Sequence, residues 1–376
     1  MTPKVARFLA EQHPATPFLV LDIDRVAQNY ATLRTALPLA QIYYAVKANP
    51  ARPVLERLVG LGSRFDAASI EEIRSCLEAG ATPQAISFGN TIKKVSSIQA
   101  AYEAGVGMYA FDSIEELEKL AEHAPGSRVY CRLMVENSGA EWPLSRKFGT
   151  TIEAARALMV RAGELGLDPY GLSFHVGSQQ TNTGSYEAAI ARVAMLFTDL
   201  RDAGVNLRMV NLGGGFPARY RDEVPAIDTF AGAIMEAMTR GFGNALPEMV
   251  IEPGRSMVAD AGLVRAEVVL VSRRDPAEPV RWVYLDIGRF GGLAETEGEA
   301  IRYRFVTEHE GTETGPVALA GPTCDGADIL YEKSNYHMPL ALKSGELVSV
   351  LSTGAYVTTY ASQRFNGFLP LAEYYV

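Results

Sequence analysis

The residues of this chain that could do chemistry lie at the ends of short, apolar, β-rich runs. They are Lys47, Asp66, Arg132, His175, Ser178, Glu252 and Arg255. Each one alone is more often ordinary: a lysine after a strand usually lies at the surface, because lysines are seldom buried. An amine, an imidazole, two carboxylates and two guanidinium groups that all lie at strand ends nevertheless indicate one shared site.

A glycine run, Gly213-Gly214-Gly215, follows one of these strands. The pattern Gly213-x-Gly215-x-x-Ala218 formally matches a dinucleotide-binding fingerprint, but Pro217 and the polar residues beyond it do not resemble a phosphate-binding helix. Backbone N–H groups of such a run can still bind a single phosphate, with Arg255 as countercharge. The alternative is a tight turn that requires glycine for its backbone angles.

A lysine, a carboxylate, an imidazole and a phosphate cup are the parts of a site for pyridoxal phosphate. The lysine amine can condense with the aldehyde of this cofactor, and a carboxylate can keep the ring nitrogen protonated. The protonated ring then accepts electrons from a substrate carbanion. The residues therefore predict amine chemistry on an aldehyde cofactor that carries a phosphate.

The elements that must position these residues alternate between residues 41 and 255. The β-rich runs are 41–48, 64–69, 85–90, 107–113, 128–135, 170–178, 208–215 and 248–255, and helical candidates include 69–80, 113–124, 151–166 and 185–204. Several helical candidates begin with Ser or Thr followed by Glu and end in Gly, as capped helices do. Eight strand–helix units fit a (β/α)8 TIM-like barrel, which typically needs ~250 residues. The rival, an open doubly wound sheet, needs fewer strands and an early glycine-rich turn.

The pattern changes after Arg255, where β-rich runs are separated by turns with little helical periodicity. We therefore expect a barrel domain over 27–255 and a mostly-β C-terminal domain over 256–376. The run PFLVLDIDRV near the N-terminus could join the second domain, which then also includes residues 1–26.

Composition excludes several classes of protein. A formal net charge of −9, scattered along the chain, argues against nucleic acid as a partner. No apolar run approaches the roughly 20 residues needed to cross a membrane, and the N-terminus does not resemble a signal peptide. Three widely spaced cysteines exclude a disulfide framework and make a metal site improbable, so we expect a cytoplasmic protein.

Motifs along nearly the whole chain resemble a known family. They are YYAVKANP, FDAASIEEI, SFHVGSQ, NLGGGFP, EPGR, GPTCDGAD, GAY and FNGF, in this order between residues 41 and 368. The set is similar to the alanine-racemase-like (fold type III) pyridoxal-phosphate decarboxylases, most of all to the ornithine/lysine decarboxylases. The resemblance implies a carboxy-lyase that converts a basic L-amino acid, most simply L-ornithine, to its diamine.

The resemblance also implies roles for individual residues. Lys47 would hold pyridoxal phosphate covalently, Glu252 would pair with its ring nitrogen, and His175 would stack on the ring. The remaining cofactor-binding residues would be Asp66, Glu72, Arg132, Ser178, Gly214, Gly215, Gly254, Arg255 and Tyr356.

Family members are homodimers whose active sites are shared between subunits. Cys324 would therefore reach the partner's site and return a proton to the substrate's α-carbon. Asp325 would bind the distal ammonium of a diamino-acid substrate. In eukaryotic members a Tyr-Asp pair also contacts the substrate, where this chain has Glu295, Glu297 and Glu299; Glu299 is the candidate.

Several alternatives remain. Glutamate is longer than aspartate and could draw the distal ammonium closer, which favours ornithine over lysine, yet lysine or dual activity stays open. An amino-acid racemase would need a catalytic tyrosine in place of Cys324. A carboxynorspermidine decarboxylase would carry other substrate motifs, and a non-catalytic homologue, as antizyme inhibitors are, should have lost residues such as Lys47.

Overall fold

The computed structural model describes residues 1–135, 139–142 and 147–376. The chain forms two compact units, one of residues 27–217 and 224–256, and one of residues 1–26, 218–223 and 257–376. We call the first the barrel unit and the second the β unit.

Within the described ranges, eight parallel strands close the barrel that the sequence predicts. The strands are β2 (Ala40–Ala45), β3 (Arg64–Ala67), β4 (Ile86–Phe88), β5 (Met108–Phe111), β6 (Arg128–Arg132), β8 (Asp168–Ser173), β10 (Met209–Asn211) and β11 (Glu248–Ile251). Each strand pairs with the next along the chain, and β11 returns to β2 with Ile251 opposite Ile42. Their carboxyl ends therefore meet at one rim, so residues that follow the strands can gather there.

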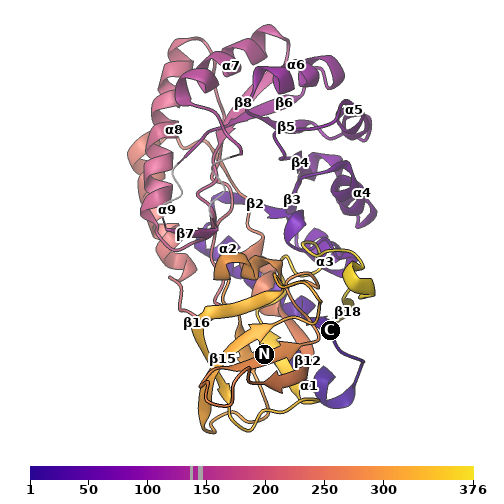
Figure 1. The fold of residues 1–376 in the computed structure, drawn as a ribbon. Helices are drawn as coiled ribbons and strands as arrows, with labels where there is room; N and C mark the ends of the chain where they lie inside the picture. Colours follow the sequence, from indigo (N-terminus) through magenta and orange to yellow (C-terminus); the bar gives the residue numbers. More distant parts are fainter. Residues whose placement is uncertain (136–138, 143–146) are drawn as a thin grey trace. The chain divides into compact units, whose positions relative to one another are not determined.

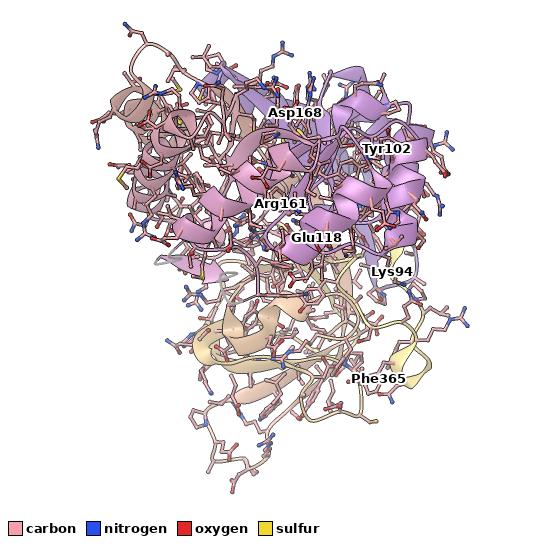
Figure 2. The ribbon with its side chains drawn as sticks, turned by 90° about the horizontal axis from the view of Figure 1, so that it is seen from above. Lys94, Tyr102, Glu118, Arg161, Asp168 and Phe365 are labelled. Carbon is pink, nitrogen blue, oxygen red and sulfur yellow. The ribbon has the colours of Figure 1, made fainter. Side chains whose placement is uncertain are left out.

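Helices surround the strands on the outside (Figure 1). They are α3 (Arg52–Gly60), α4 (Ile70–Glu78), α5 (Val95–Glu103), α6 (Ile114–His123), α7 (Ile152–Glu164), α8 (Gly184–Asp202) and α9 (Ile227–Phe242), with α2 (Ile23–Ala36) beginning in the β unit. Figure 2 shows Tyr102, Glu118 and Arg161 on this outer layer, where all three are exposed. A short ribbon of β7 (Ala140–Trp142) and β9 (Ser178–Gln180) was not expected from the sequence.

The predicted helix starts are capped by hydroxyl side chains. Ser69 Oγ accepts the N–H of Glu72 at 3.1 Å, and Ser113 Oγ accepts that of Glu116 at 3.3 Å. Thr151 does the same at the start of α7, with 3.2 Å to the N–H of Ala154. These bonds satisfy N–H groups that have no partner inside the helix, which fixes where each helix begins.

Side chains from six strands pack together as a core cluster. They are Tyr43, Met108, Ala110, Tyr130, Tyr170, Met209 and Val250. Tyr44, next to Tyr43 on β2, is also fully buried, and its hydroxyl donates to the carbonyl of Asn49 at 2.9 Å. Burial of consecutive residues is typical of barrel strands, which are covered on both faces.

The β unit consists mostly of strands, and all of them except β1 follow the barrel in the sequence. The strands are β1 (Phe18–Leu21), β12 (Gly262–Ser272), β13 (Arg281–Leu285), β14 (Arg304–Val306), β15 (Thr314–Ala320), β16 (Ile329–Pro339), β17 (Leu347–Leu351) and β18 (Ala372–Tyr375). The N-terminal strand β1 pairs with β12, Leu19 opposite Val264, and with β18, Leu19 opposite Glu373. Helix α1 (Pro3–Glu11) packs Val5 and Phe8 against the same layer.

One boundary differs from the sequence-based expectation. Residues 218–223, expected in the barrel domain, belong to the β unit. The N–H of Arg221 donates to the carbonyl of Arg302 at 2.8 Å, and an Arg302–Asp222 ion pair of 2.8 Å adds a second link. Such contacts between distant segments leave no periodic signal in the sequence.

No helix in the described ranges is long and apolar enough to cross a bilayer.

Candidate active site

Lys47 lies directly after the first barrel strand. Strand β2 ends at Ala45, and a single 3₁₀ turn, Val46–Ala48, carries the lysine. The N–H of Ala45 donates to the carbonyl of Pro253 at 3.0 Å, which ties this end of β2 to the segment after β11. The Lys47 side chain is 48% exposed and its Nζ lies 3.9 Å from Asp66 Oδ2. The amine is thus accessible and close to one carboxylate.

Asp66 is a buried carboxylate with an unsatisfied oxygen. Its side chain is 6% exposed, and Oδ1 has no hydrogen-bond partner among the described residues. Burial raises the pKa of Asp66, against the charges of Lys47 and Arg132. Gly89 lies directly against it, because a Cβ at position 89 would stand 1.8 Å from Oδ1. A buried acceptor without a donor is costly, so this oxygen suits a ligand that brings a donor.

Glu252 follows β11 and is held by Asn211, whose side-chain amide donates to Oε1. Burial, and next the charge of Asp66, raise the pKa of Glu252 to about 7. Asp66 and Glu252 therefore share this end of the barrel, and the positive charges of Lys47 and Arg132 do not offset the effect of burial on the pKa of Glu252. A protonated ring nitrogen beside Glu252 would supply the missing charge and lower that pKa.

His175 is set up as a neutral imidazole. Its Nδ1 accepts the N–H of Gly177 at 3.0 Å, which leaves the proton of the neutral ring on Nε2. Burial, and next the charges of Arg132 and Lys47, hold the pKa of His175 well below its usual value. A Cβ at Gly214 would lie 3.4 Å from Nε2, so the ring borders the glycine run. A neutral aromatic ring suits stacking on another ring.

The glycine run forms a cradle that side chains would close. A Cβ at Gly214 would lie 2.5 Å from the carbonyl of Glu252, and Gly215, at φ +107°, would place one 2.5 Å from the carbonyl of Gly177. The hydroxyl of Tyr186 donates to the carbonyl of Gly214 at 2.9 Å, which fixes the run. Only glycine fits this close approach.

Arg255 brings positive charge to a hydroxyl in the same unit. It is 3% exposed, and its Nε and Nη2 donate to Ser178 Oγ at 3.2 and 3.1 Å. Gly254 precedes it at the start of the short helix α10 (Arg255–Val258). A buried guanidinium beside a hydroxyl is suited to binding a phosphate.

Arg132 and Glu72 lie around the same end of the barrel. Arg132 ends β6, its charge acts on Asp66, His175 and Glu252, and its guanidinium carbon lies 5.1 Å from the ring centre of Phe148. Glu72 Oε2 accepts the N–H of Ala68 at 2.7 Å. The residues thus fit pyridoxal phosphate: an amine, an unsatisfied carboxylate oxygen, a glycine cradle and a buried cation.

Other predicted site residues lie in the β unit. They are Cys324, Asp325, Tyr356 and Glu299. Cys324 is exposed, and its N–H donates to Asn366 Oδ1 at 3.0 Å. Asp325 Oδ1 accepts the N–H of Ala327 at 2.8 Å. The proposed relation of these residues to the barrel site stays a prediction.

The carboxylate of Glu299 has a structural task. It accepts the N–H groups of Glu332 and Lys333 at 2.8 and 2.7 Å, and the hydroxyl of Ser334. Glu295, in the same 3₁₀ segment (Ala294–Glu299), is 5% exposed, whereas Glu297 is exposed. A substrate contact through Glu299 remains a prediction and must compete with these bonds to β16.

Sequence reasoning missed several residues that support the site. Asn211 holds Glu252 and also accepts the N–H of Gly213 at 2.9 Å; it opens the NLGGG motif, where its position at a strand end was a usable signal. Gly89 follows β4 and leaves room for the carboxylate of Asp66. No pattern in the sequence indicates this close contact. Asp328, the last residue of GPTCDGAD, is 2% exposed and holds the loop that carries Cys324.

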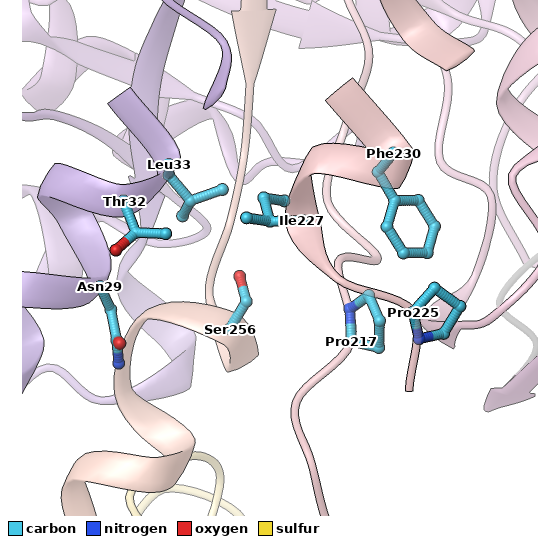
Figure 3. Close-up of a pocket in the computed structure, with 8 residues that line it drawn as sticks. All are labelled: Asn29, Thr32, Leu33, Pro217, Pro225, Ile227, Phe230 and Ser256. Atoms are coloured by element: carbon cyan, nitrogen blue, oxygen red, sulfur yellow. The ribbon is translucent and has the colours of Figure 1, made fainter. Parts of the chain in front are cut away.

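A small cavity of about 110 Å³ lies elsewhere in the barrel unit, between α2, α9 and the start of α10 (Figure 3). Its lining residues are Asn29, Thr32, Leu33, Pro217, Pro225, Ile227, Phe230 and Ser256. None of these described residues is charged, so the cavity lacks the amine and the carboxylates that the chemistry needs.

Known proteins resemble this chain over nearly its whole length. Residues 23–259 match the family model "Pyridoxal-dependent decarboxylase, pyridoxal binding domain". The lysine/ornithine decarboxylase of Selenomonas ruminantium is 34% identical over 370 residues, which cover 98% of this chain and 91% of that protein.

Two solved structures cover nearly the whole chain. That of lysine/ornithine decarboxylase from Vibrio vulnificus complexed with cadaverine is 32% identical, with a TM-score of 0.88 over 99% of this chain and 98% of the other. The arginine decarboxylase of Paramecium bursaria Chlorella virus is 27% identical, with a TM-score of 0.90 over 100% of both chains. The chain therefore belongs to the fold type III pyridoxal-phosphate-dependent decarboxylases of basic amino acids, in the ornithine/lysine decarboxylase group.

Proposed function

We propose that this decarboxylase converts L-ornithine to putrescine. The observation that carries the proposal is the set of groups at the barrel rim, where Lys47 lies beside Asp66 and the charges of both act on Glu252. Pyridoxal phosphate, when bound, supplies an aldehyde that condenses with amines and a ring that accepts electrons.

The barrel unit would bind both ends of the cofactor, its aldehyde and its phosphate. Lys47 Nζ would form the covalent link, and the cradle of Gly214 and Gly215 with Arg255 would bind the phosphate. Glu252 would keep a proton on the ring nitrogen, because a carboxylate there favours the charged form of its partner. His175 would cover one face of the ring and exclude water from it.

The β unit would supply the substrate contacts and the proton donor. Asp325 would bind the distal ammonium of the substrate, since a charged pair is an effective way to select a diamino acid. Cys324 Sγ would hold the proton that goes to the α-carbon after carbon dioxide leaves. A donor placed at that atom directs the proton to the product.

We further propose a homodimer in which Cys324 and Asp325 serve the partner's site. Apolar exposure near this loop supports the proposal: Phe365, Phe368 and Leu369 are 37%, 44% and 81% exposed. They line a cavity of about 590 Å³ that also includes Pro322 and Thr323. Large apolar side chains exposed beside one another are typical of a site that another chain covers.

The choice of ornithine over lysine rests on side-chain length. Glutamates stand in segment 294–299 where eukaryotic relatives carry a Tyr-Asp pair, and a longer carboxylate shortens the space for the substrate's distal amine. Lysine is the second candidate, because the relative from Selenomonas ruminantium carries both substrates in its name.

Steady-state kinetics with L-ornithine, L-lysine and L-arginine test the proposal. The expected result is the highest kcat/KM for L-ornithine, and Glu299→Gln should raise KM if its carboxylate also reaches substrate. A higher kcat/KM for lysine or arginine overturns the choice of ornithine. No decarboxylation of any of the three overturns the proposal as a whole.

A further inference from the structure

Asp328 closes the loop on which the proposed proton donor stands. Loop 321–328 joins β15 to β16, and residues 324–327 are exposed while Asp328 is 2% exposed. The N–H of Gly321 donates to the carbonyl of Asp328 at 2.8 Å, so the first and last residues of the loop meet. The carboxylate of Asp328 therefore points into the unit beneath an exposed loop.

This carboxylate holds two separate segments. Its Oδ2 accepts the N–H of Thr323 at 3.1 Å and the Thr323 hydroxyl at 2.7 Å. Its Oδ1 accepts the N–H of Arg289 at 2.7 Å. Hydrogen bonds to a buried carboxylate are stronger than neutral ones, so Thr323, the residue before Cys324, is firmly placed.

Two glycines leave room for the carboxylate. A Cβ at Gly288 would lie 2.2 Å from Asp328 Oδ1, and one at Gly321 would lie 2.4 Å from both oxygens. Gly288 and Gly321, which are far apart in the sequence, thus meet at Asp328. The residue after Arg289, Phe290, packs on Phe365 with ring centres 4.9 Å apart, next to Asn366, which binds the N–H of Cys324.

We propose that Asp328 is a positioning residue for Cys324: it fixes Thr323 and thereby the direction from which the thiol delivers its proton. The proposal rests on the proposed function of Cys324 as proton donor. Misplacement of a catalytic group by about 1 Å can cost on the order of a hundredfold in rate, so a loosened loop should act on proton delivery.

The first readout is the ratio of diamine to amino-aldehyde released from the diamino acid that the enzyme turns over. The aldehyde would form when the proton goes to the cofactor's carbon instead of the α-carbon: water then supplies the aldehyde oxygen, and the amino group stays on the cofactor. Cys324→Ala should raise the aldehyde fraction strongly. Asp328→Ala should raise it on the order of tenfold, and Thr323→Val, which loses one bond to Asp328, should raise it less.

The second readout is hydrogen exchange of the cofactor-free protein. Asp328→Ala should speed exchange in a peptide over 321–329 and leave barrel peptides unchanged, which shows that the variant is folded. Thr314→Val, an exposed threonine at the start of β15, is the control for Thr323→Val and should change neither readout.

The outcomes separate the two proposals. If Cys324→Ala raises the aldehyde fraction while Asp328→Ala and Thr323→Val do not, the positioning role is overturned and the role of Cys324 stands. If Cys324→Ala leaves the fraction unchanged, the role of Cys324 is overturned and the positioning role with it. If Asp328→Ala does not fold, Thr323→Val tests the positioning role by itself. An unchanged aldehyde fraction in Thr323→Val then overturns that role.

Discussion

Replacing Glu252 by glutamine should change how the stability of the cofactor-free protein depends on pH. Burial and the charge of Asp66 raise the pKa of Glu252 from 4.5 to about 7. At ~1.4 kcal/mol per pH unit, this rise corresponds to about 3 kcal/mol in favour of the protonated carboxyl.

The sign follows from proton binding. Between pH 4.5 and about 7 the folded protein keeps a proton that the unfolded chain has released. The free energy of unfolding therefore falls as pH rises through this window. Glutamine does not titrate, so Glu252→Gln lacks this fall and should be more stable than wild type at pH 8.

The assay compares melting temperatures of the two cofactor-free proteins from pH 5 to pH 8. Wild type should lose on the order of 5 °C relative to Glu252→Gln over this range. Asn211→Ala removes the hydrogen bond that lowers the pKa of Glu252, so its window should extend to higher pH. If the melting temperatures of wild type and Glu252→Gln change with pH in parallel, the reasoning that Glu252 is a buried carboxylate with a raised pKa is refuted.

Further expectations concern other residues of both units. The Lys93 ammonium is buried and donates to the carbonyls of Asn90 and Ala110 at 2.7 and 2.6 Å beside Glu116 at 2.9 Å, so Lys93→Met should lower the unfolding free energy by about 3 kcal/mol. Lys94→Met, at an exposed neighbour (Figure 2), should change it by less than about 0.5 kcal/mol, and equal effects in denaturant titrations would contradict the buried pair. Gly89→Ala should displace Asp66 and weaken cofactor binding measured by fluorescence titration; unchanged affinity would mean that Asp66 has no part in the site. A thiol reagent should label exposed Cys324 first, because Cys76 and Cys131 are buried and burial raises the pKa of Cys76 to about 12. Rapid labelling of the Cys324→Ala variant would contradict this order of reactivity.

The barrel was predictable because its signals are local. Apolar residues give way to Lys47 just after β2 and to Glu252 just after β11, and helix starts such as Ser69 carry their own caps. Charged groups after successive parallel strands must meet at one rim, so their gathering in the barrel unit followed from topology. The structure confirms both the predicted barrel and the additional mostly-β unit.

Contacts between distant segments could not be predicted in the same way. The placement of residues 218–223 in the β unit depends on bonds such as that from Arg221 to Arg302. Glu299 was a candidate substrate contact, yet its carboxylate accepts hydrogen bonds from β16. Asp328 had no predicted role, yet it joins Thr323 to Arg289. Such partners are chosen by tertiary packing and leave no spacing pattern.

The central claim is that Lys47 anchors pyridoxal phosphate for decarboxylation, and the absorption spectrum of the protein mixed with this cofactor tests it most directly. Wild type and the exposed-site control Lys94→Ala should show a near-ultraviolet or visible band of protein-bound cofactor that survives gel filtration. Lys47→Ala should lack the covalent band. A wild-type protein without this band, or a Lys47→Ala protein that keeps it, would contradict the account.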